Sequence, residues 1–333
     1  MTKSIFITGA TGFVGSHLYE NLLKEGFNTL GLARSEKKWQ SFNLPGAPVL
    51  GDLSDSSLKS WVNNLPEDLT HFVHTAGVVH SFETQIFEKT NTQATITLFE
   101  LLKERFPKLH FIFISSLAAA GPASPHPLKE EDPPRPVSAY GRSKLKAEEY
   151  ISSHLAPEMK LTIIRPPMVI GPRDPAVLDV FKMVKGRVIL NTGLKGPQKT
   201  YSIVCVFDLV TLITNVIKKS EELEKITSYY PSFPRHYTFA EIINSMEKGL
   251  NVKTVGLPIP FPVVKALASL LNAAYKVKKH DMRLTPDKIN ELAPMAWTCD
   301  GAKSLQELDM VYDYDLDRTV EITIEDYQKR GWL

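Results

Sequence analysis

Residues 4–26, SIFITGATGFVGSHLYENLLKEG, decide the fold class of this chain. The stretch opens with a short apolar run that predicts a buried strand, and it ends with a periodic, leucine-rich segment that predicts a helix. Between the two, Gly9, Gly12 and Gly15 are spaced three residues apart. Glycines in such a turn let the backbone approach a diphosphate closely, at the N-terminus of the next helix. The stretch therefore predicts a dinucleotide site at the first strand-to-helix turn.

The same alternation of strand and helix continues to about residue 170. It is typical of a parallel sheet with helices on both faces. We therefore predict an α/β fold, a Rossmann-like doubly wound parallel sheet, with a smaller and mostly helical C-terminal cap that binds substrate. The dinucleotide-binding domain is predicted over 1–170, with segments around 200–230 that return to it, and the cap over 171–333. Predicted strands are 4–8, 28–34, 47–53, 69–77, 109–116, 160–167, 200–205 and 226–232, and predicted helices include 13–26, 91–106, one with Tyr140, one capped by Asp208, and 261–280.

Composition narrows the class of protein. The 333 residues carry a formal net charge of +2 and no basic tract, which argues against a nucleic-acid partner. Cys205 and Cys299 lie far apart without metal-ligand spacing, so no metal site is expected. No apolar run reaches the roughly 18–20 residues of a membrane span. A strand that begins near Lys3 leaves no room for a signal peptide, and these features together predict a cytoplasmic protein.

The residues after the second and third predicted strands bear on the choice of cofactor. An acid at the end of the second strand typically binds the 2′-hydroxyl of NAD, whereas an Arg accommodates the 2′-phosphate of NADP. Here the second strand ends in Ala33, Arg34 and Ser35. We therefore favour NADP over NAD. The alternative is that Arg34 is an ordinary surface residue with no role in cofactor binding. Asp52 ends the third strand, where its carboxylate could meet the adenine amino group.

A tyrosine and a lysine lie one helical turn apart in SAYGRSK, as Tyr140 and Lys144. Their side chains leave the same helix face, which fits either a solvated surface or a proton-transfer pair. Other polar and small residues come after the fourth and fifth strands, in HTAG and ISSLAAAGP, where doubly wound sheets bind ligands. Ser115 and Ser116 are part of this group, and either hydroxyl could bond a substrate oxygen or cap a helix.

Six segments together resemble the extended short-chain dehydrogenase/reductase superfamily, which includes the NAD-dependent epimerase/dehydratase family. They are TGATGFVG, HTAG, SSLAAAGP, YGRSK, RPPMVIGPRD and WTCDGAKSLQELDM, and they span the chain. In sequence, SSLAAAGP and RPPMVIGPRD are most similar to the 3β-hydroxysteroid dehydrogenase and dihydroflavonol-reductase-like branch of this superfamily. The resemblance implies that Ser116, Tyr140 and Lys144 are catalytic, with Ser115 as the runner-up for the serine, and that Asn91 is structural. The cofactor-binding residues that we expect are Gly9, Thr11, Gly12, Phe13, Val14, Gly15, Arg34, Asp52, Leu53, Thr75, Ala76, Gly77, Tyr140, Lys144 and Pro167.

The predicted chemistry is acid–base catalysis by Tyr140 during hydride transfer. A free tyrosine has a pKa of about 10 and is a weak base at neutral pH. Lys144 and a positive nicotinamide ring are expected to favour the phenolate. Tyr140 would then take the proton from an alcohol as hydride leaves its carbon, while Ser116 polarises the same oxygen.

Several residues differ from the family's usual motifs, and these differences bear on which substrate we predict. Leu117, Ala118 and Ala119 stand where dehydratases carry an acid pair, so elimination of water lacks its acid. Pro167 stands where many epimerases are expected to carry an Asn, and Cys205 stands where a His is usual. Expected substrate contacts are His80, Ser116 and Arg173. Arg173 could pair with an anionic substrate, and an ion pair with Asp174 is the alternative.

The sequence thus predicts an NAD(P)-dependent oxidoreductase that interconverts a secondary alcohol and a ketone on a largely apolar small molecule. One alternative is a nucleotide-sugar epimerase with bound NAD, and another is a non-catalytic dinucleotide sensor. The apolar helix over 261–280, with Lys276, Lys278 and Lys279 at its end, fits ordinary packing, closure over an apolar ligand or weak contact with a membrane surface. A homodimer is also left open.

Overall fold

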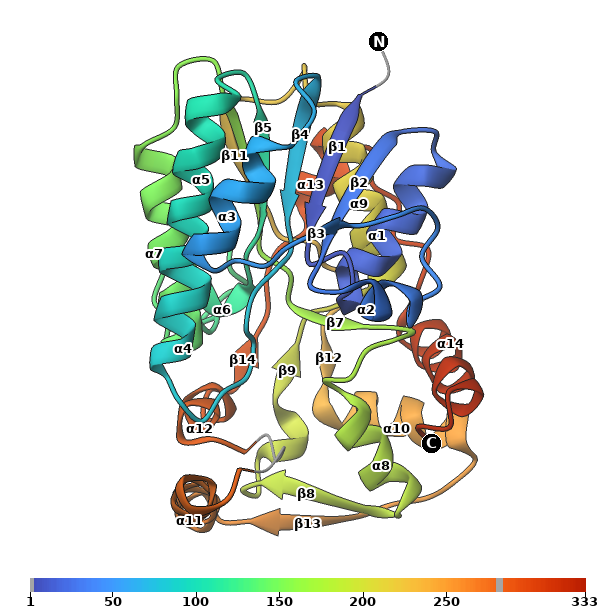
Figure 1. Ribbon diagram of the computed structural model, residues 1–333. Coiled ribbons are helices and arrows are strands. Elements are labelled where there is room, and N and C mark those ends of the chain that lie inside the picture. The colour runs from blue at the N-terminus through green and yellow to red at the C-terminus, as the bar shows by residue number, and fades with distance from the viewer. Residues whose placement is uncertain (1–2, 280–283) are drawn as a thin grey trace.

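A computed structural model describes residues 3–279 and 284–333 (Figure 1), so His280, the last residue of the predicted helix 261–280, lies outside the described residues. Its centre is a seven-stranded sheet in which every neighbouring pair is parallel. The predicted doubly wound fold is confirmed. In spatial order the strands are β11 (Ile226–Tyr229), β6 (Lys160–Ile164), β5 (His110–Ile114), β4 (Leu69–His74), β1 (Ser4–Thr8), β2 (Asn28–Ala33) and β3 (Val49–Leu50).

Helices cover both faces of this sheet, because successive side chains of a buried strand point to opposite faces. Ile5 and Ile7 of β1 pack in a core with leucines of α1 and α9, whereas Phe6 packs on the other face with residues of α3 and α5. Each large side chain buried in this way stabilises the fold by about 1.5–3 kcal/mol. The helices of this half are α1 (Phe13–Lys24), α2 (Glu36–Gln40), α3 (Asp55–Asn63), α4 (Gln85–Phe87), α5 (Ala94–Arg105), α6 (Leu117–Ala120), α7 (Ala139–Ser153) and α9 (Val206–Lys218), and η1 (Glu88–Gln93) is a π-helical turn.

The second half of the chain forms a smaller unit below the carboxyl ends of the central strands. Its core is apolar and lies between α8, α10 and α14. A capping box starts α10, with Thr238 and Glu241 each bonded to the other's backbone N–H. The remaining elements are β7 (Met168–Ile170), α8 (Leu178–Lys185), β8 (Val188–Thr192), η2 (Gly196–Gln198), β9 (Thr200–Tyr201), β10 (Ile203–Cys205), β12 (Tyr237–Thr238), α10 (Phe239–Leu250), β13 (Val255–Ile259), α11 (Phe261–Val277), α12 (Pro286–Leu292), β14 (Ala296–Trp297), α13 (Ala302–Glu307) and α14 (Leu316–Lys329).

Three local predictions were wrong. The strand predicted over 200–205 is two strands, β9 and β10, which belong to two different small sheets. The third strand is only Val49–Leu50 and not 47–53, since proline and glycine interrupt the run on either side. Asp208 does not cap α9, because the N-cap is Cys205 and Asp208 lies in the first turn. The Asp208 carboxylate instead accepts the backbone N–H groups of Asp313 and Tyr314, at 3.1 and 3.3 Å. It therefore fastens the segment before α14 to α9, and burial raises its pKa to about 6.

None of the helices in the described residues is long and apolar enough to cross a membrane. In the same part of the chain, no group of three or more His, Cys, Asp or Glu side chains is placed to hold a metal ion. Cys205 and Cys299 are free thiols and both are buried.

Three buried histidines on neighbouring central strands should make the protein sensitive to acid. Burial lowers the pKa of His71 to about 2, and those of His74 and His110 to about 3, from an ordinary 6.5. A lowered pKa means that the folded state resists protonation, so stability is complete above 6.5 and is lost as pH falls below it. Each histidine contributes up to ~1.4 kcal/mol of lost stability per pH unit in that window.

Urea unfolding between pH 7.5 and 5.5 measures this loss. We expect the free energy of unfolding to fall with pH, and the fall to be shallower in His71→Phe. The exposed His154→Gln on α7 is the matched control and should keep the original slope. A free energy of unfolding that is flat across this range would contradict the prediction.

Candidate active site

The turn between β1 and α1 is closed by contacts that leave no room for a side chain. Gly9 has a φ of +72°, and a Cβ there would lie 2.5 Å from Oγ1 of Thr75. A Cβ on Gly15 would lie 2.1 Å from the carbonyl oxygen of Gly9. The turn thus brings the backbone of β1, α1 and the residue after β4 together, and α1 starts at Gly12 without a side-chain cap. Such a cradle fits a diphosphate on free helix N–H groups, and Thr11, Phe13 and Val14 lie partly buried around it.

The adenosine end predicted for the cofactor lies after β2 and β3. Arg34 is exposed at the end of β2. The Asp52 carboxylate accepts the backbone N–H and the hydroxyl of Ser54, at 2.8 and 2.5 Å. These two bonds lower the pKa of Asp52, with a smaller contribution from the charge of Arg34. The two side chains are therefore electrostatic neighbours at this corner, and Leu53 packs against the core behind them.

Residues after β4 lie beside Lys144. Thr75 donates its hydroxyl to the carbonyl of Thr8, at 2.7 Å. Gly77 is exposed, and a Cβ there would lie 3.3 Å from Nζ of Lys144 and 3.1 Å from Oδ1 of Asn91. The backbone of Gly77 therefore lies directly beside Lys144 and Asn91.

Asn91 holds this segment in place from the π-helical turn η1. Its Oδ1 accepts the N–H of Val78 and its Nδ2 donates to the carbonyl of Val78, both at 2.8 Å. Nδ2 also donates to the hydroxyl of Ser143 at 3.2 Å, one residue before Lys144. Single π-helical turns within helices are frequently found at functional sites. Here it aims a buried amide at the loop after β4.

Ser116 and Tyr140 meet across two short loops. Ser116 caps α6, and its Oγ accepts the N–H of Ala118 at 3.1 Å. Tyr140 is the second residue of α7, which begins after the capping residue Ser138. Ser116 lies close enough to the Tyr140 hydroxyl to lower its pKa, against the larger effect of burial. Ser115 is buried, and its Oγ has no hydrogen-bond partner among the described residues, so Ser116 rather than Ser115 is the serine that acts on Tyr140.

Lys144 lies one turn along α7 and is almost fully buried. Its Nζ donates to the carbonyl of Ile114 at 2.9 Å and lies 4.7 Å from the ring centroid of Phe113. Burial lowers its pKa to about 8, opposed by the charge of Glu148. The ammonium group is thus held at the end of β5, next to Gly77, with its charge destabilised by its surroundings.

The pKa of Tyr140 moves in the direction opposite to the one predicted. In the protein without cofactor, burial raises it to about 12; the hydrogen bond from Ser116 lowers it and the charge of Glu291 raises it. The predicted decrease from Lys144 is therefore absent here. The physical reason is that removal from water destabilises the phenolate by more than the neighbouring groups stabilise it. The decrease that a positive nicotinamide ring would cause stays a prediction.

Helix α12 is a part of the site that the sequence did not reveal. The Asp287 carboxylate accepts the backbone N–H of Ala139 at 2.7 Å and that of Tyr140 at 3.3 Å. It therefore caps α7 from a helix almost 150 residues away in sequence. Glu291, one turn further along α12, pairs with Lys288 at 2.5 Å and raises the pKa of Tyr140. Thr285 and Pro286 are typical of a helix start, but nothing in them indicates which helix α12 contacts.

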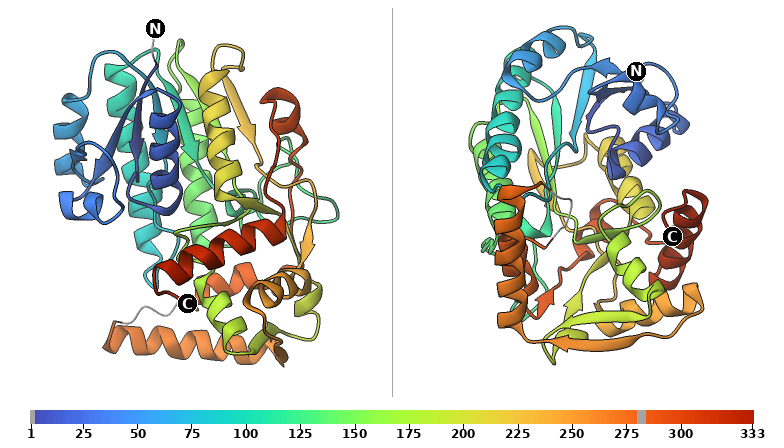
Figure 2. Two further views of the ribbon diagram at one scale, coloured as in Figure 1. Left: turned by 90° about the vertical axis from the view of Figure 1, so that its right-hand side faces the viewer. Right: turned by 60° about the horizontal axis from the view of Figure 1, so that its bottom comes forward.

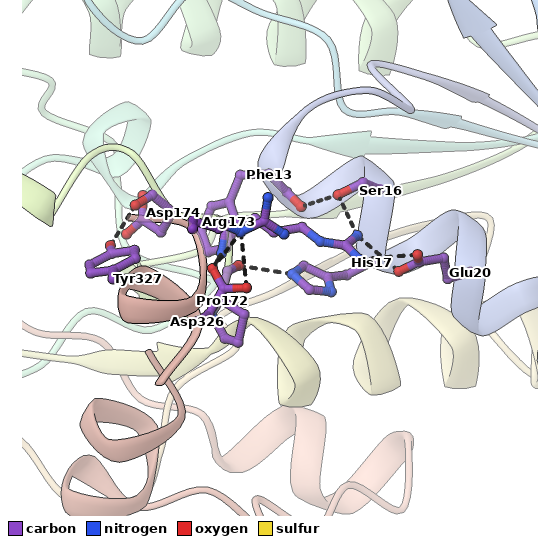
Figure 3. A network of polar contacts seen from close by, with 10 residues as sticks. Phe13, Ser16, His17, Glu20, Pro172, Arg173, Asp174, Asp326 and Tyr327 are labelled. Carbon is purple, nitrogen blue, oxygen red and sulfur yellow. Dashed lines mark hydrogen bonds and ion pairs between the residues drawn. The ribbon is translucent and has the colours of Figure 1, made fainter. Parts of the chain in front are cut away.

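Arg173 lies in a polar network that joins the two halves of the molecule (Figure 3). Its guanidinium group forms two hydrogen bonds to the carboxylate of Glu20 on α1, at 2.8 and 3.0 Å. Its backbone N–H donates to Asp326 of α14 at 2.8 Å. The alternative partner suggested from the sequence, Asp174, was wrong, because the carboxylate that it meets is Glu20. Arg173 thus contacts both α1 and α14.

The other predicted residues lie nearby or at the edge of this region. His80 packs edge-on against Phe82, with centroids 5.9 Å apart, and Phe82 stacks on Tyr275 of α11 at 4.6 Å. Pro167 is partly buried in the segment between β6 and β7. Cys205 is buried, and burial raises the pKa of its thiol to about 11.

A hollow of about 510 Å³ lies away from these residues, at the β11 edge of the sheet. None of the predicted site residues lines it. Its lining consists of Glu130, Glu131, Ile163, Arg165, Ile226, Thr227, Ser228 and Lys303.

Comparison with known proteins places the chain among nucleotide-dependent enzymes. The model of the NAD dependent epimerase/dehydratase family matches residues 5–229. A UDP-glucose 4-epimerase of Vibrio cholerae is 27% identical over 309 residues, covering 89% of this chain and 91% of that protein. A ceramide reductase of Caulobacter vibrioides is 24% identical over 336 residues, covering 99% of this chain and 96% of that protein. An N-acetyl-α-D-glucosaminyl-diphospho-ditrans,octacis-undecaprenol 4-epimerase of Escherichia coli O157:H7 is 28% identical over 274 residues, covering 79% and 77%.

Solved structures share the fold over the whole chain. The UDP-glucose 4-epimerase of Bifidobacterium longum, in complex with NAD+ and UDP, superposes with a TM-score of 0.76 at 19% identity, covering 99% of both chains. The UDP-glucuronic acid 4-epimerase of Bacillus cereus, in complex with UDP-glucuronic acid and NAD, gives 0.75 at 19% identity, covering 98% of this chain and 99% of that one. At these identities the likeness shows the fold alone.

Proposed function

Because the chain belongs to the NAD-dependent epimerase/dehydratase family, we propose that it catalyses hydride transfer between a pyridine dinucleotide and a secondary alcohol carbon, with Tyr140 as the proton carrier. One observation supports this most directly. Ser116 is near enough to the Tyr140 hydroxyl to lower its pKa, and Lys144 lies one turn away beside the exposed backbone of Gly77. A non-catalytic sensor would not need these three side chains to converge.

Each of the three side chains has a distinct role in this proposal. A bound nicotinamide supplies or accepts the hydride. Tyr140 donates a proton to the carbonyl oxygen as it becomes an alcohol, or removes one in the reverse direction. Ser116 donates a hydrogen bond to the same oxygen and stabilises the charge that develops on it. Lys144 binds ribose hydroxyls near Gly77 and so holds the nicotinamide end of the cofactor beside Tyr140.

The fate of the hydride distinguishes two candidate functions. The first is epimerisation, in which the hydride returns to the opposite face of the same carbon and nucleotide is not consumed. The named relatives include 4-epimerases of UDP-glucose and of a lipid-linked sugar. These comparisons support the epimerase alternative better than our prediction of an oxidoreductase with an apolar substrate.

The second candidate is net reduction of a ketone on a lipid, and two observations favour it. The ceramide reductase of Caulobacter vibrioides aligns with nearly the whole of both chains. In addition, the residues after Ser116 are Leu117, Ala118, Ala119 and Ala120, which offer no polar group to a sugar hydroxyl. An apolar neighbourhood beside the proton carrier suits an acyl or alkyl chain better than a sugar ring.

The deciding experiment measures both outcomes on one preparation. The protein is assayed with UDP-glucose, UDP-glucuronic acid and a long-chain 3-ketone analogue of ceramide, with NAD(H) and NADP(H). Formation of the C4 epimer without net change in reduced nucleotide supports the first candidate. Ketone-dependent oxidation of reduced nucleotide supports the second. Nucleotide binding without turnover of any substrate in the panel would contradict both and indicate a sensor.

The cofactor that we propose is NADP, on the basis of the exposed Arg34 at the end of β2. Arg34→Asp removes a partner for the 2′-phosphate and supplies an acceptor for a 2′-hydroxyl. We expect the ratio of Kd for NADP to Kd for NAD to rise at least about tenfold, measured by titration calorimetry. The solved neighbours hold NAD, so equal affinity of the unaltered protein for both nucleotides, or a preference for NAD, would refute this proposal. Lys37→Asp, exposed in α2, is the control for charge alone.

A further inference from the structure

One end of the molecule exposes an unusual amount of apolar surface. It is formed by β8, β13 and α11, which lie together at the end opposite the N-terminus (Figures 1 and 2). We propose that this surface, which we term the lower face, docks on an anionic phospholipid bilayer. The lower face is defined by the exposed side chains Val188, Leu190, Leu194, Val255, Leu257, Val263, Leu267, Leu270 and Val277.

The concentration of these side chains is the first observation. Within the described residues, fifteen large apolar side chains are exposed, and nine of them belong to the lower face. Single exposed leucines and valines are normal on a protein surface, but a contiguous group marks a binding surface. The elements that carry these side chains are directly connected. β13 leads through Pro260 into α11, and the N–H of Gly193, after β8, donates to the carbonyl of Ile259 at 2.8 Å.

The pair of strands β8 and β13 shows that the exposed apolar side chains are arranged on one face and are not scattered. β8 and β13 are parallel, with Val188 opposite Val255 and Leu190 opposite Leu257. These four side chains share the outer face, whereas the intervening Ile189 is buried on the inner face. A sheet with one wet face normally alternates apolar inside with polar outside. The outer face of this pair is apolar instead, and its side chains match across the strands.

Helix α11 divides into three sectors, at about 100° of rotation per residue. The buried sector contains Val264 and Ala268, which pack against Ile289 of α12. A separate exposed sector carries the apolar stripe, and a third carries the polar side chains. The stripe consists of Val263, Ala266, Leu267, Leu270, Ala273, Ala274 and Val277, and the polar sector of Lys265, Ser269, Asn272 and Lys276. A helix with an unburied apolar face beside a basic one is typical of the membrane interface.

Charge identifies the partner as anionic. The segment from Val255 to Lys279 contains four lysines and no acidic residue. The segment from Gly186 to Lys199 likewise contains Arg and Lys but no acid. Cations of this kind around an apolar patch attract a bilayer with anionic headgroups. They also argue against a second copy of the chain, because two-fold pairing of this face would place like charges against one another.

The lower face is connected to the candidate active site through α11 and α12. Tyr275 stacks on Phe82, and Lys279 pairs with Glu83, both in the loop after β4. Helix α12 packs on the buried side of α11 and caps the helix that carries Tyr140. A bilayer bound to the lower face would therefore lie on the side of the molecule where α11 meets the site. A substrate carried by a membrane lipid fits this arrangement, and the docking itself does not depend on the proposed function.

The test is binding to vesicles in the absence of nucleotide and substrate. The full chain is mixed with vesicles of phosphatidylcholine alone, or of phosphatidylcholine with phosphatidylglycerol, and the bound fraction is measured by flotation. We expect binding to the anionic vesicles that weakens with salt, and little binding to phosphatidylcholine alone. The double variant Leu267→Glu/Leu270→Glu should bind at least about tenfold more weakly. Lys265→Glu/Lys276→Glu should lose the preference for anionic lipid.

The control is Leu305→Glu/Val311→Glu, which places two acids at exposed apolar positions outside the lower face and should leave binding unchanged. Circular dichroism and melting temperature check that each variant is folded. No binding of the unaltered chain to anionic vesicles would overturn the proposal. So would a dimer in lipid-free ultracentrifugation that Leu267→Glu/Leu270→Glu dissociates, because the lower face would then contact a second copy. Failure of the activity assays alone would leave vesicle binding intact, so the two proposals fail separately.

Discussion

Replacement of Tyr140 by Phe should lower kcat by a factor of about a thousand while leaving fold and nucleotide affinity nearly unchanged. The substitution deletes one oxygen and keeps the ring, which packs edge-on against Phe87 with centroids 5.8 Å apart. It removes the hydroxyl that we propose as the proton carrier, whose pKa Ser116 lowers. Single-turnover hydride transfer, followed by nucleotide absorbance, measures the effect directly. The matched control is Tyr150→Phe on the same helix, where a tyrosine stacks on His154 away from the site.

The pH profile gives a second readout for the same residue. In the protein without nucleotide the pKa of Tyr140 is about 12, so the hydroxyl is protonated across the neutral range. Alcohol oxidation needs the phenolate and should accelerate as pH rises, whereas ketone reduction needs the protonated form and should slow. A positive nicotinamide ring would shift this titration to lower pH. Near-normal turnover of Tyr140→Phe, with an unchanged profile, would show that another group carries the proton.

The sequence predicts most of the central sheet and the tight glycine turn after β1 well, because both depend on local pattern. Most central strands are short apolar runs, and glycines spaced three apart between a strand and a helix indicate a turn with no room for side chains. Asn91 could also be placed, since the resemblance indicates its position in the chain. In these cases the information lies within a few residues of the feature that it predicts.

Features that depend on long-range packing could not be predicted. Asp287 caps α7 from 148 residues away at Ala139, and Glu20 takes the guanidinium group of Arg173 from 153 residues away. The nearest acid in sequence, Asp174, was a reasonable guess and a wrong one. The rise in the pKa of Tyr140 that burial causes was not foreseen, for a related reason. Helical spacing shows that Lys144 is near, but not how far the surrounding structure removes the phenol from water.

Lys144→Met should lower kcat/KM by about a hundredfold or more and weaken nucleotide binding as well, which distinguishes it from Tyr140→Phe. Methionine fills much of the same space, so the buried stem keeps its packing. The loss is confined to the ammonium group, which donates to the carbonyl of Ile114 and faces Gly77. The proposed contact with the ribose would disappear, and with it the placement of the nicotinamide for hydride transfer. Titration calorimetry with nucleotide, alongside steady-state kinetics, separates the two losses.

The matched control and the pH dependence make this prediction specific. Lys146→Met removes an exposed lysine of the same helix, whose ion pair with Glu88 lies at the surface, and should change little. The pKa of Lys144 is about 8, so the ammonium group is charged below that pH and neutral above it. Nucleotide affinity should therefore fall as pH rises through about 8 in the unaltered protein, and this fall should be absent in Lys144→Met. If the variant retained both the affinity and its pH dependence, the lysine would be a structural residue of β5 and α7 rather than part of the site.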